Sequence, residues 1–247
     1  MHFSRITVTM TKQLKKSSVK TMKQPYQCKY CLTRFHKESS LIHHQCVKKR
    51  RHMEADATGP RIGFAVFSRY NALLYRTTKP KTLDEFVNNQ FYIEFVKFGH
   101  YIANLRPLHV DKFIDYVIMS GEKIKEWYSD RVYYRYIVDL LKKEPAISAV
   151  ERSIETIMGW AQDNSCEFTE FFHVVSANEA AFMIQSGKLS PWVLYLANSG
   201  GELMEKFNED HVKMIGHSID AAYWAQKFRK DSADVEYIQT LLDQSGL

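Results

Sequence analysis

Three cysteines and a histidine near the start of the chain have the spacing of a metal site. Cys28 and Cys31 are separated by two residues, and His44 and Cys46 follow within the next fifteen positions. Thiolate and imidazole groups are the usual ligands of Zn²⁺, which takes four of them in a tetrahedron. The sequence therefore predicts one structural Zn²⁺ ion bound by Cys28, Cys31, His44 and Cys46.

The choice of the last two ligands leaves alternatives open. His44 and Cys46 are two positions apart, so on a regular helix they would point to different faces. Either the helix ends at His44, or His43 is the ligand and uses its i,i+3 spacing to Cys46, with His52 as a more distant choice. Free thiols in a disordered tail and a disulfide are the other interpretations. No signal peptide is evident, and a reducing interior favours a metal over a disulfide for this pattern.

The segment 26 to 46 resembles a C2H2-type zinc finger. The family pattern, aromatic-x-Cys-x2-Cys-x3-Phe-x5-Leu-x2-His, is met in full from Tyr26 through Phe35 and Leu41 to His44. The second histidine of the family is replaced by Cys46, so the segment is similar to a CCHC-type variant. The resemblance implies a ββα unit with a hairpin that carries two cysteines, followed by a helix over about 37 to 44. By the same resemblance, the base-reading positions of DNA-binding fingers are held by Lys37, Ser40 and His43.

The charge of the chain is divided unevenly. Residues 1 to 53 contain 13 Lys and Arg but a single acidic residue, whereas the remainder contains 21 Lys and Arg and 27 Asp and Glu. Such asymmetry is typical of a basic segment for nucleic acid joined to an acidic globular body. Phosphate contacts are expected from the cluster directly after the finger: Lys48, Lys49, Arg50 and Arg51.

The predicted fold class is mainly α, a small ββα finger followed by a multi-helix domain. The expected segments are a basic disordered arm at 1–24, the finger at 25–47, a basic linker at 48–60 that contains Gly59-Pro60, and a helical domain at 61–247. No window of eighteen apolar residues exists in the sequence, so no membrane span is predicted.

Helical periodicity continues through the expected helical domain. Thr82 and Glu85 form a capping-box pattern, and apolar residues then recur at steps of four and three from Phe91 to Leu105. The short apolar runs 171–175 and 192–197 are compatible with strands or with buried helical turns. Gly200-Gly201 is expected to be a turn.

These features predict a non-enzymatic zinc-finger protein that binds nucleic acid, DNA rather than RNA. Its acidic helical domain is expected to bind a protein partner or a second copy of the chain. One alternative is an assembly factor whose finger binds a protein. A less favoured alternative is a nuclease with Mg²⁺ on scattered carboxylates such as Asp130, Asp139 and Glu144, whose spacing does not distinguish them from surface charge.

The whole chain also resembles uncharacterised zinc-finger proteins encoded by tailed bacteriophages. The resemblance is carried by the single finger, the KKRR cluster at 48–51, and the Ser-Pro-Trp-Val-Leu-Tyr segment from Ser190 to Tyr195. It implies a location in the cytoplasm of an infected bacterium and supplies no activity. The absence of an apolar leader in the N-terminal residues favours the same cytoplasmic expectation.

Overall fold

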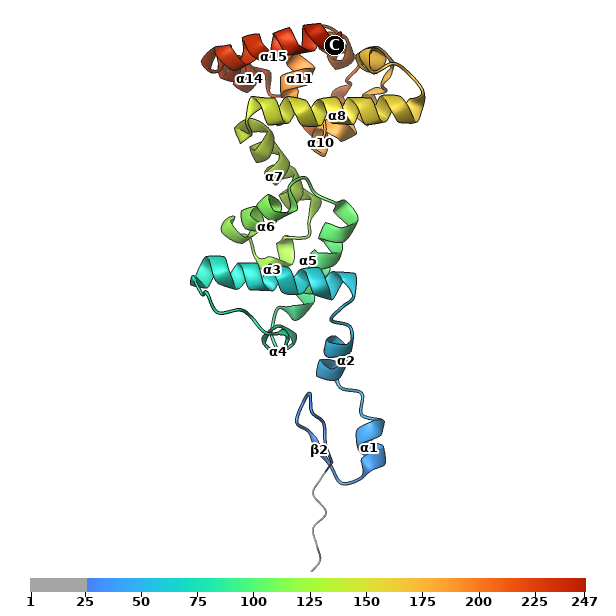
Figure 1. The fold of residues 1–247 in the computed structure, drawn as a ribbon, viewed down its shortest axis with the longest axis vertical. Coiled ribbons are helices and arrows are strands. Elements are labelled where there is room, and N and C mark those ends of the chain that lie inside the picture. Colours follow the sequence, from blue (N-terminus) through green and yellow to red (C-terminus); the bar gives the residue numbers. More distant parts are fainter. Residues whose placement is uncertain (1–25) are drawn as a thin grey trace, which may run out of the picture. The chain divides into compact units, whose positions relative to one another are not determined.

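A computed structural model describes residues 26–247, and most of these residues are helical (Figure 1). The expectation of a mainly α protein is confirmed, because within 26–247 the sheet structure is limited to one pair of short strands. The chain divides into two compact units that meet between Arg50 and Arg51. The basic arm expected at 1–24 lies outside the described residues.

The first unit contains a two-stranded hairpin and a short helix. Strand β1 (Tyr26–Gln27) pairs antiparallel with β2 (Arg34–Phe35), with Tyr26 opposite Phe35 and Gln27 opposite Arg34. Helix α1 (Glu38–Ile42) follows directly. The order β, β, α is therefore present, and α1 is shorter than the helix expected over 37 to 44.

Residues 48 to 60, expected as a basic linker, are largely helical in the structure. They contain most of α2 (Val47–Met53) and the first turn of α3 (Thr58–Tyr75). Pro60 does not interrupt α3, because it falls in the first turn, where a backbone N–H has no intrahelical acceptor to lose.

The helical unit begins with an aromatic-rich core, whose buried side chains include Phe95, Phe98, Phe113 and Trp127. These rings are buried because the helices carry apolar side chains at helical spacing on the faces that pack together. The elements that form this core are α3, α4 (Leu83–Val87), α5 (Tyr92–Leu105), α6 (Val110–Met119), the 3₁₀ turn η1 (Ile124–Glu126) and α7 (Asp130–Lys143).

Glycines allow α3 and α5 to pack with their backbones close together. A Cβ added at Gly99 of α5 would lie 2.2 Å from the carbonyl oxygen of Gly59, and one at Gly63 would lie 2.8 Å from the carbonyl oxygen of Phe95. Real Cβ atoms do not approach a backbone so closely. Gly59, which the sequence analysis placed in a linker, is therefore a helix-packing residue.

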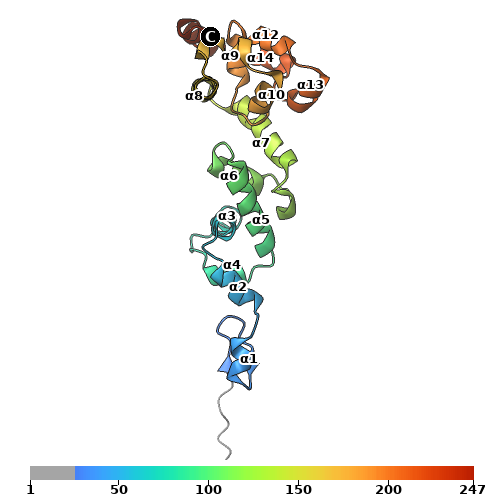
Figure 2. The same cartoon turned by 90° about the vertical axis from the view of Figure 1, so that its right-hand side faces the viewer.

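A second core lies in the C-terminal half of the helical unit, around Phe171, Trp192 and Trp224. In Figures 1 and 2 its helices follow α7 in the yellow to red part of the chain. They are α8 (Ala146–Asn164), the 3₁₀ turn η2 (Phe168–Glu170), α9 (Phe171–Val174), α10 (Ala177–Gln185), α11 (Pro191–Leu196), α12 (Gly200–Glu205), α13 (Glu209–Ile215), α14 (Ala221–Lys230) and α15 (Ser232–Ser245).

The ambiguous runs of the last third are helical. Residues 171–175 lie in and just after α9, and 192–197 in and just after α11, where Pro191 is the first helical residue. Gly200 and Gly201 begin α12 instead of forming a separate turn. A Cβ at Gly200 would lie 2.0 Å from the Leu194 carbonyl oxygen, so the helix can begin here only with glycine.

A buried ion pair spans the junction between α7 and α8. The Arg152 guanidinium binds both carboxylate oxygens of Glu144, at 2.7 Å for the Nη2–Oε1 pair, and its Nε donates to the Gly187 carbonyl at 2.7 Å. The Glu144 and Arg152 side chains are 3% and 13% exposed. A bidentate pair with a further acceptor satisfies most of the polar groups that burial removes from water.

Candidate metal centre

The hairpin brings Cys28 and Cys31 to one side of a tight turn. The Cys28 amide donates to the Thr33 carbonyl at 3.0 Å, and the Leu32 amide donates back to the Cys28 carbonyl at 2.8 Å. Leu32 adopts the left-handed conformation, with φ of 61°, which non-glycine residues rarely adopt. The turn is therefore closed by its own backbone, and both sulfurs belong to one rigid loop.

The end of α1 settles the choice between the two histidines. The helix ends at Ile42 and residues 44–46 are irregular, so His44 and Cys46 are not held on opposite helical faces. His44 Nε2 lies 3.2 Å from the Cys31 sulfur. The His43 ring is exposed, and its Nδ1 lies 2.7 Å from the Ser39 carbonyl oxygen. Thus the structure brings His44, and not His43, to the cysteines.

Cys46 occupies the position before the first residue of α2. The Lys49 amide donates to the Cys46 sulfur at 3.3 Å, and the Arg50 amide donates to the Cys46 carbonyl at 3.0 Å. The sulfur therefore accepts the bond that an N-cap oxygen accepts in other helices. The amide groups at a helix N-terminus carry partial positive charge, which opposes the effect of burial on this thiol.

The four ligand atoms form one group. The sulfurs of Cys28, Cys31 and Cys46 and a ring nitrogen of His44 all lie within 4.8 Å of one another. A tetrahedral ion with bonds of about 2.0 to 2.3 Å requires ligand atoms roughly 3.3 to 3.8 Å apart. The observed group needs only a small contraction to reach that geometry, so these residues can hold a metal ion.

Hydrogen bonding prepares Cys31 for coordination. Its sulfur and the Thr33 hydroxyl lie 3.1 Å apart. The Thr33 hydroxyl, then the Thr33 backbone amide and His44, lower the pKa of the Cys31 thiol to about 6. Burial has the opposite effect on Cys46 and raises the pKa of its thiol, against the bond from the Lys49 amide. A bound cation would favour the thiolate at both positions.

Thr33 is a residue of this site that the sequence did not indicate. The finger pattern leaves the three positions between Cys31 and Phe35 unspecified. Thr33 could have been identified from its position, because a hydroxyl two residues after a cysteine in a tight turn can form a hydrogen bond with the sulfur.

Few apolar contacts support the cluster. The Phe35 and His44 rings lie 4.8 Å apart between centroids, and Phe35 is half-buried. Between residues 26 and 50 the buried side chains are those of Cys28 and Cys46. The ligands themselves therefore form the centre of this unit.

The residues expected to read bases lie on the exposed surface of the unit. Lys37 is the residue before α1, Ser40 lies within α1, and His43 directly follows it. Glu38, in the first turn of α1, is the sole acidic residue between 26 and 50, against six Lys and Arg.

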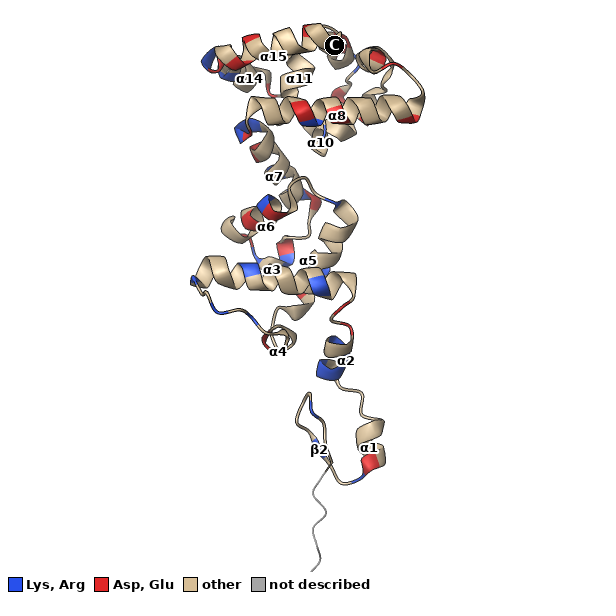
Figure 3. Ribbon diagram, viewed as in Figure 1, with Lys and Arg blue, Asp and Glu red and all other residues tan. Residues whose placement is uncertain are grey.

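The four residues of the expected phosphate-binding cluster are in different environments on α2. Lys48 and Arg50 are exposed and Lys49 is half-buried. The basic part of α2 is blue in Figure 3. Arg51 belongs to the helical unit and is engaged within it: its Nη1 donates to the Val87 carbonyl at 2.7 Å, and its guanidinium lies 4.2 Å from the centre of the Tyr92 ring.

His52, the distant choice for a metal ligand, is also engaged elsewhere. Its Nε2 lies 3.0 Å from a carboxylate oxygen of Asp84, within the helical unit. The described residues contain no second group of three or more His, Cys, Asp and Glu with the geometry of a metal site.

The carboxylates considered for a nuclease are not brought together. Asp130 accepts a hydrogen bond from the Tyr101 hydroxyl at 3.1 Å, Asp139 pairs with Lys143 at 3.1 Å, and Glu144 is bound by Arg152. Each has its own partner in the helical unit, and none belongs to a common site.

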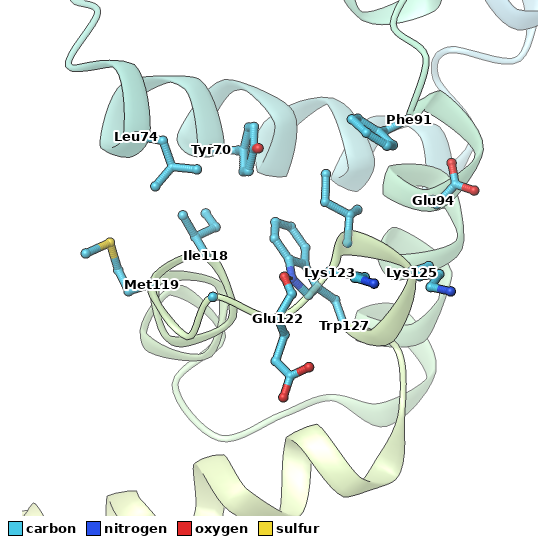
Figure 4. Close-up of a pocket in the computed structure, with 12 residues that line it drawn as sticks. Tyr70, Leu74, Phe91, Glu94, Ile118, Met119, Glu122, Lys123, Lys125 and Trp127 are labelled. Atoms are coloured by element: carbon cyan, nitrogen blue, oxygen red, sulfur yellow. Dashed lines mark hydrogen bonds between the residues drawn. The ribbon is translucent and has the colours of Figure 1, made fainter.

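A separate apolar pocket lies in the first half of the helical unit (Figure 4). Its volume is about 640 Å³, and it is lined by residues of α3, α5, α6 and η1 and by Trp127. The Trp127 indole N–H donates to the Glu122 carbonyl at 3.0 Å, so this polar group is already satisfied. The remaining lining is mostly aliphatic and aromatic, and its charged groups, among them Glu94 and Lys125, lie at the rim.

Across residues 26–247, none of the helices combines the length and apolar character that crossing a membrane requires. Comparison of the chain with protein-family models, curated proteins and solved structures gave no match. The similarity to a CCHC finger therefore depends on the residues and the geometry described above.

Proposed function

We propose that the protein binds nucleic acid through a zinc-stabilised finger and the basic residues on either side of its last ligand. The observation that carries this proposal is the Cys₃His group, whose ligand atoms lie within 4.8 Å of one another. Zn²⁺ fits this group best, because three sulfurs and one imidazole are typical of structural zinc sites and unsuited to Mg²⁺ or Ca²⁺.

The charge of the unit supports a polyanionic partner. Exposed Lys37 directly precedes α1, and Lys48 and Lys49 lie in the first turn of α2, which starts after the ligand Cys46. A metal that fixes Cys46 also fixes the start of α2, because the Lys49 amide binds the Cys46 sulfur. Lysines in this arrangement would contact phosphates without regard to sequence. We exclude Arg51 from this surface, because its guanidinium is bound to Val87 and Tyr92.

DNA is the favoured nucleic acid, as the finger resemblance implies. One finger covers about three base pairs, so Lys37 alone supplies little discrimination between sequences. We therefore expect moderate affinity, a strong salt dependence and weak sequence preference. The acidic helical unit is proposed to bind a protein partner or a second copy of the chain.

Fluorescence anisotropy of the zinc-loaded protein with labelled duplex DNA, single-stranded DNA and RNA tests this proposal. The Lys48→Ala/Lys49→Ala double variant should weaken binding equally for all sequences and reduce the slope of log K against log salt by about two. Lys230→Ala, an exposed lysine in the helical unit, is the matched control and should leave the slope unchanged. Absence of binding at low salt by zinc-loaded protein would refute the proposal and favour the alternative, a finger that binds a protein.

A further inference from the structure

A serine, a histidine and a glutamate form one hydrogen-bonded chain in the helical unit. The Ser199 Oγ lies 3.1 Å from His173 Nε2, and His173 Nδ1 lies 2.8 Å from a carboxylate oxygen of Glu202. His173 belongs to α9, Ser199 directly precedes α12, and Glu202 lies in the first turn of α12. Helices α9 and α12 are in contact and can be followed in Figure 2.

The carboxylate decides which ring nitrogen of His173 carries the proton. An ionised carboxylate only accepts hydrogen bonds, so in a neutral ring the proton must lie on Nδ1, facing Glu202. Nε2 then carries the lone pair, and the Ser199 hydroxyl donates to it. This is the arrangement in which an imidazole takes a proton from an attacking serine.

The Ser199 hydroxyl is directed to the histidine at the expense of a common local bond. Serine before the first residue of a helix usually accepts a hydrogen bond from a backbone amide of the first turn. Ser199 makes no such bond. Its position is nevertheless fixed, because the Leu203 amide donates to its carbonyl at 3.4 Å.

The histidine is held on a fixed support. Its neighbour Phe172 is fully buried in the second core. Lys206 Nζ donates to the carbonyl oxygens of Phe172 and His173, at 3.2 and 2.8 Å. The backbone that carries the His173 ring is therefore anchored from both the core and α12.

A substrate can reach the serine from solvent. The His173 and Glu202 side chains are 50% and 62% exposed, and a Cβ added at Gly201 would meet no atom within 4 Å. An open site excludes little water and stabilises a developing oxyanion only modestly. Such a site suits esters with good leaving groups better than amides.

We infer that Ser199 and His173 form an esterase site, with Glu202 as a positioning residue. The Ser199 oxygen bonds to the ester carbonyl carbon as its proton passes to His173 Nε2. The carbon–oxygen bond to the alcohol then breaks, and the alcohol oxygen takes that proton, which leaves an acyl-serine. Water bonds to the acyl carbon and gives a proton to Nε2, and the Ser199 oxygen leaves with it. The products are a carboxylic acid and an alcohol.

Labelling of the full-length protein tests this inference. The protein is treated with p-nitrophenyl acetate, release of p-nitrophenolate is followed by absorbance, and a fluorophosphonate adduct is located by peptide mass spectrometry. We expect a Ser199 adduct that Ser199→Ala abolishes and that His173→Ala slows about 100-fold. Ser186→Ala is the matched control, because the Ser186 hydroxyl donates to the Met183 carbonyl and not to a histidine.

The role of Glu202 needs a measurement that a structural role would not change. The ring ¹⁵N chemical shifts of His173 should report the Nδ1–H tautomer in the wild type. In Glu202→Gln they should report a larger population of the Nε2–H tautomer, and Ser199 should be labelled more slowly. Circular dichroism melting confirms that each variant is folded. Labelling of Ser199 no faster than of Ser186, an equal rate in His173→Ala, or an unchanged tautomer in Glu202→Gln would each overturn the inference.

Discussion

The finger and the helical unit bury different kinds of side chain. The helical unit buries two apolar cores, with Phe98, Trp192 and Leu203 among its fully buried side chains. Between residues 26 and 50, the buried side chains belong to two proposed metal ligands, Cys28 and Cys46. A unit of this size cannot bury enough apolar surface to fold without a cross-link or an ion. The two units should therefore respond to different perturbations.

The largest effect is expected from loss of a metal ligand. Structural zinc contributes about 10 to 16 kcal/mol of apparent binding free energy in such modules, so Cys28→Ser should unfold the finger. Limited proteolysis within 26–50 and backbone NMR signals of these residues measure this. The helical unit should keep its thermal unfolding midpoint.

Cys166→Ser is the matched control for this prediction. Cys166 lies outside the ligand group, in the loop after α8. Its substitution should leave the finger protected from proteolysis. A finger that stays as ordered in Cys28→Ser as in the wild type would remove the distinction between the two units.

The helical unit should instead be sensitive to a cavity in its core. The Phe98 side chain is fully buried against Trp127 and Phe113. Phe98→Ala is expected to lower the free energy of unfolding of this unit by about 3 to 5 kcal/mol, while metal content stays unchanged. Urea unfolding followed by tryptophan fluorescence measures the change. Tyr237→Ala, at a residue 56% exposed, should change it by less than about 0.5 kcal/mol.

A smaller effect is expected at the start of α4. The Glu85 amide donates to the Thr82 hydroxyl at 3.2 Å, and the Thr82 amide donates to the Glu85 carboxylate at 2.8 Å. Thr82→Ala should destabilise the helical unit by about 1 kcal/mol. Comparing the thermal unfolding midpoints of Thr82→Ala and Thr82→Ser, which keeps the hydroxyl, separates the contribution of the capping hydrogen bond from that of the side-chain methyl group. Equal midpoints for the Ala and Ser variants would show that the cap contributes nothing.

The same cap predicts a dependence on pH. The bond from the Thr82 backbone amide, followed by the Lys81 ammonium, lowers the pKa of Glu85 in the folded protein. Its stabilisation is therefore present above the carboxyl's unfolded pKa, about 4.3, and is lost as pH falls through the folded value. Glu85→Gln should melt below the wild type at pH 7, and the difference should shrink in acid. A difference that is constant with pH would contradict this assignment.

Features determined by nearby residues could be predicted from the sequence. The capping box of Thr82 and Glu85 and the apolar face of α5 depend on spacings of three and four residues, and both are present in the structure. The finger hairpin and the approach of Cys28, Cys31, His44 and Cys46 also follow from a local pattern. The capping box begins α4 and the periodic run forms α5, and residues 88–91 separate the two helices.

Features that depend on distant residues could not be predicted. The sequence placed Gly59 and Pro60 in a linker. The role of Gly59 depends on its contact with Gly99 of α5, which is distant in the sequence, and local residues do not reveal that contact. The runs 171–175 and 192–197 have no periodicity that separates strand from helix, and burial against the second core decides for helix. The same limit applies to His173 and Ser199, which are 26 positions apart and meet only in the folded unit.

Metal content is the most direct test of the central claim, that the finger is held together by an ion on three sulfurs and an imidazole. Elemental analysis of protein purified without added metal should give about one zinc per chain, reduced to a trace in Cys28→Ser and unchanged in Cys166→Ser. Wild-type protein without bound metal, or equal zinc in Cys28→Ser, would contradict the account.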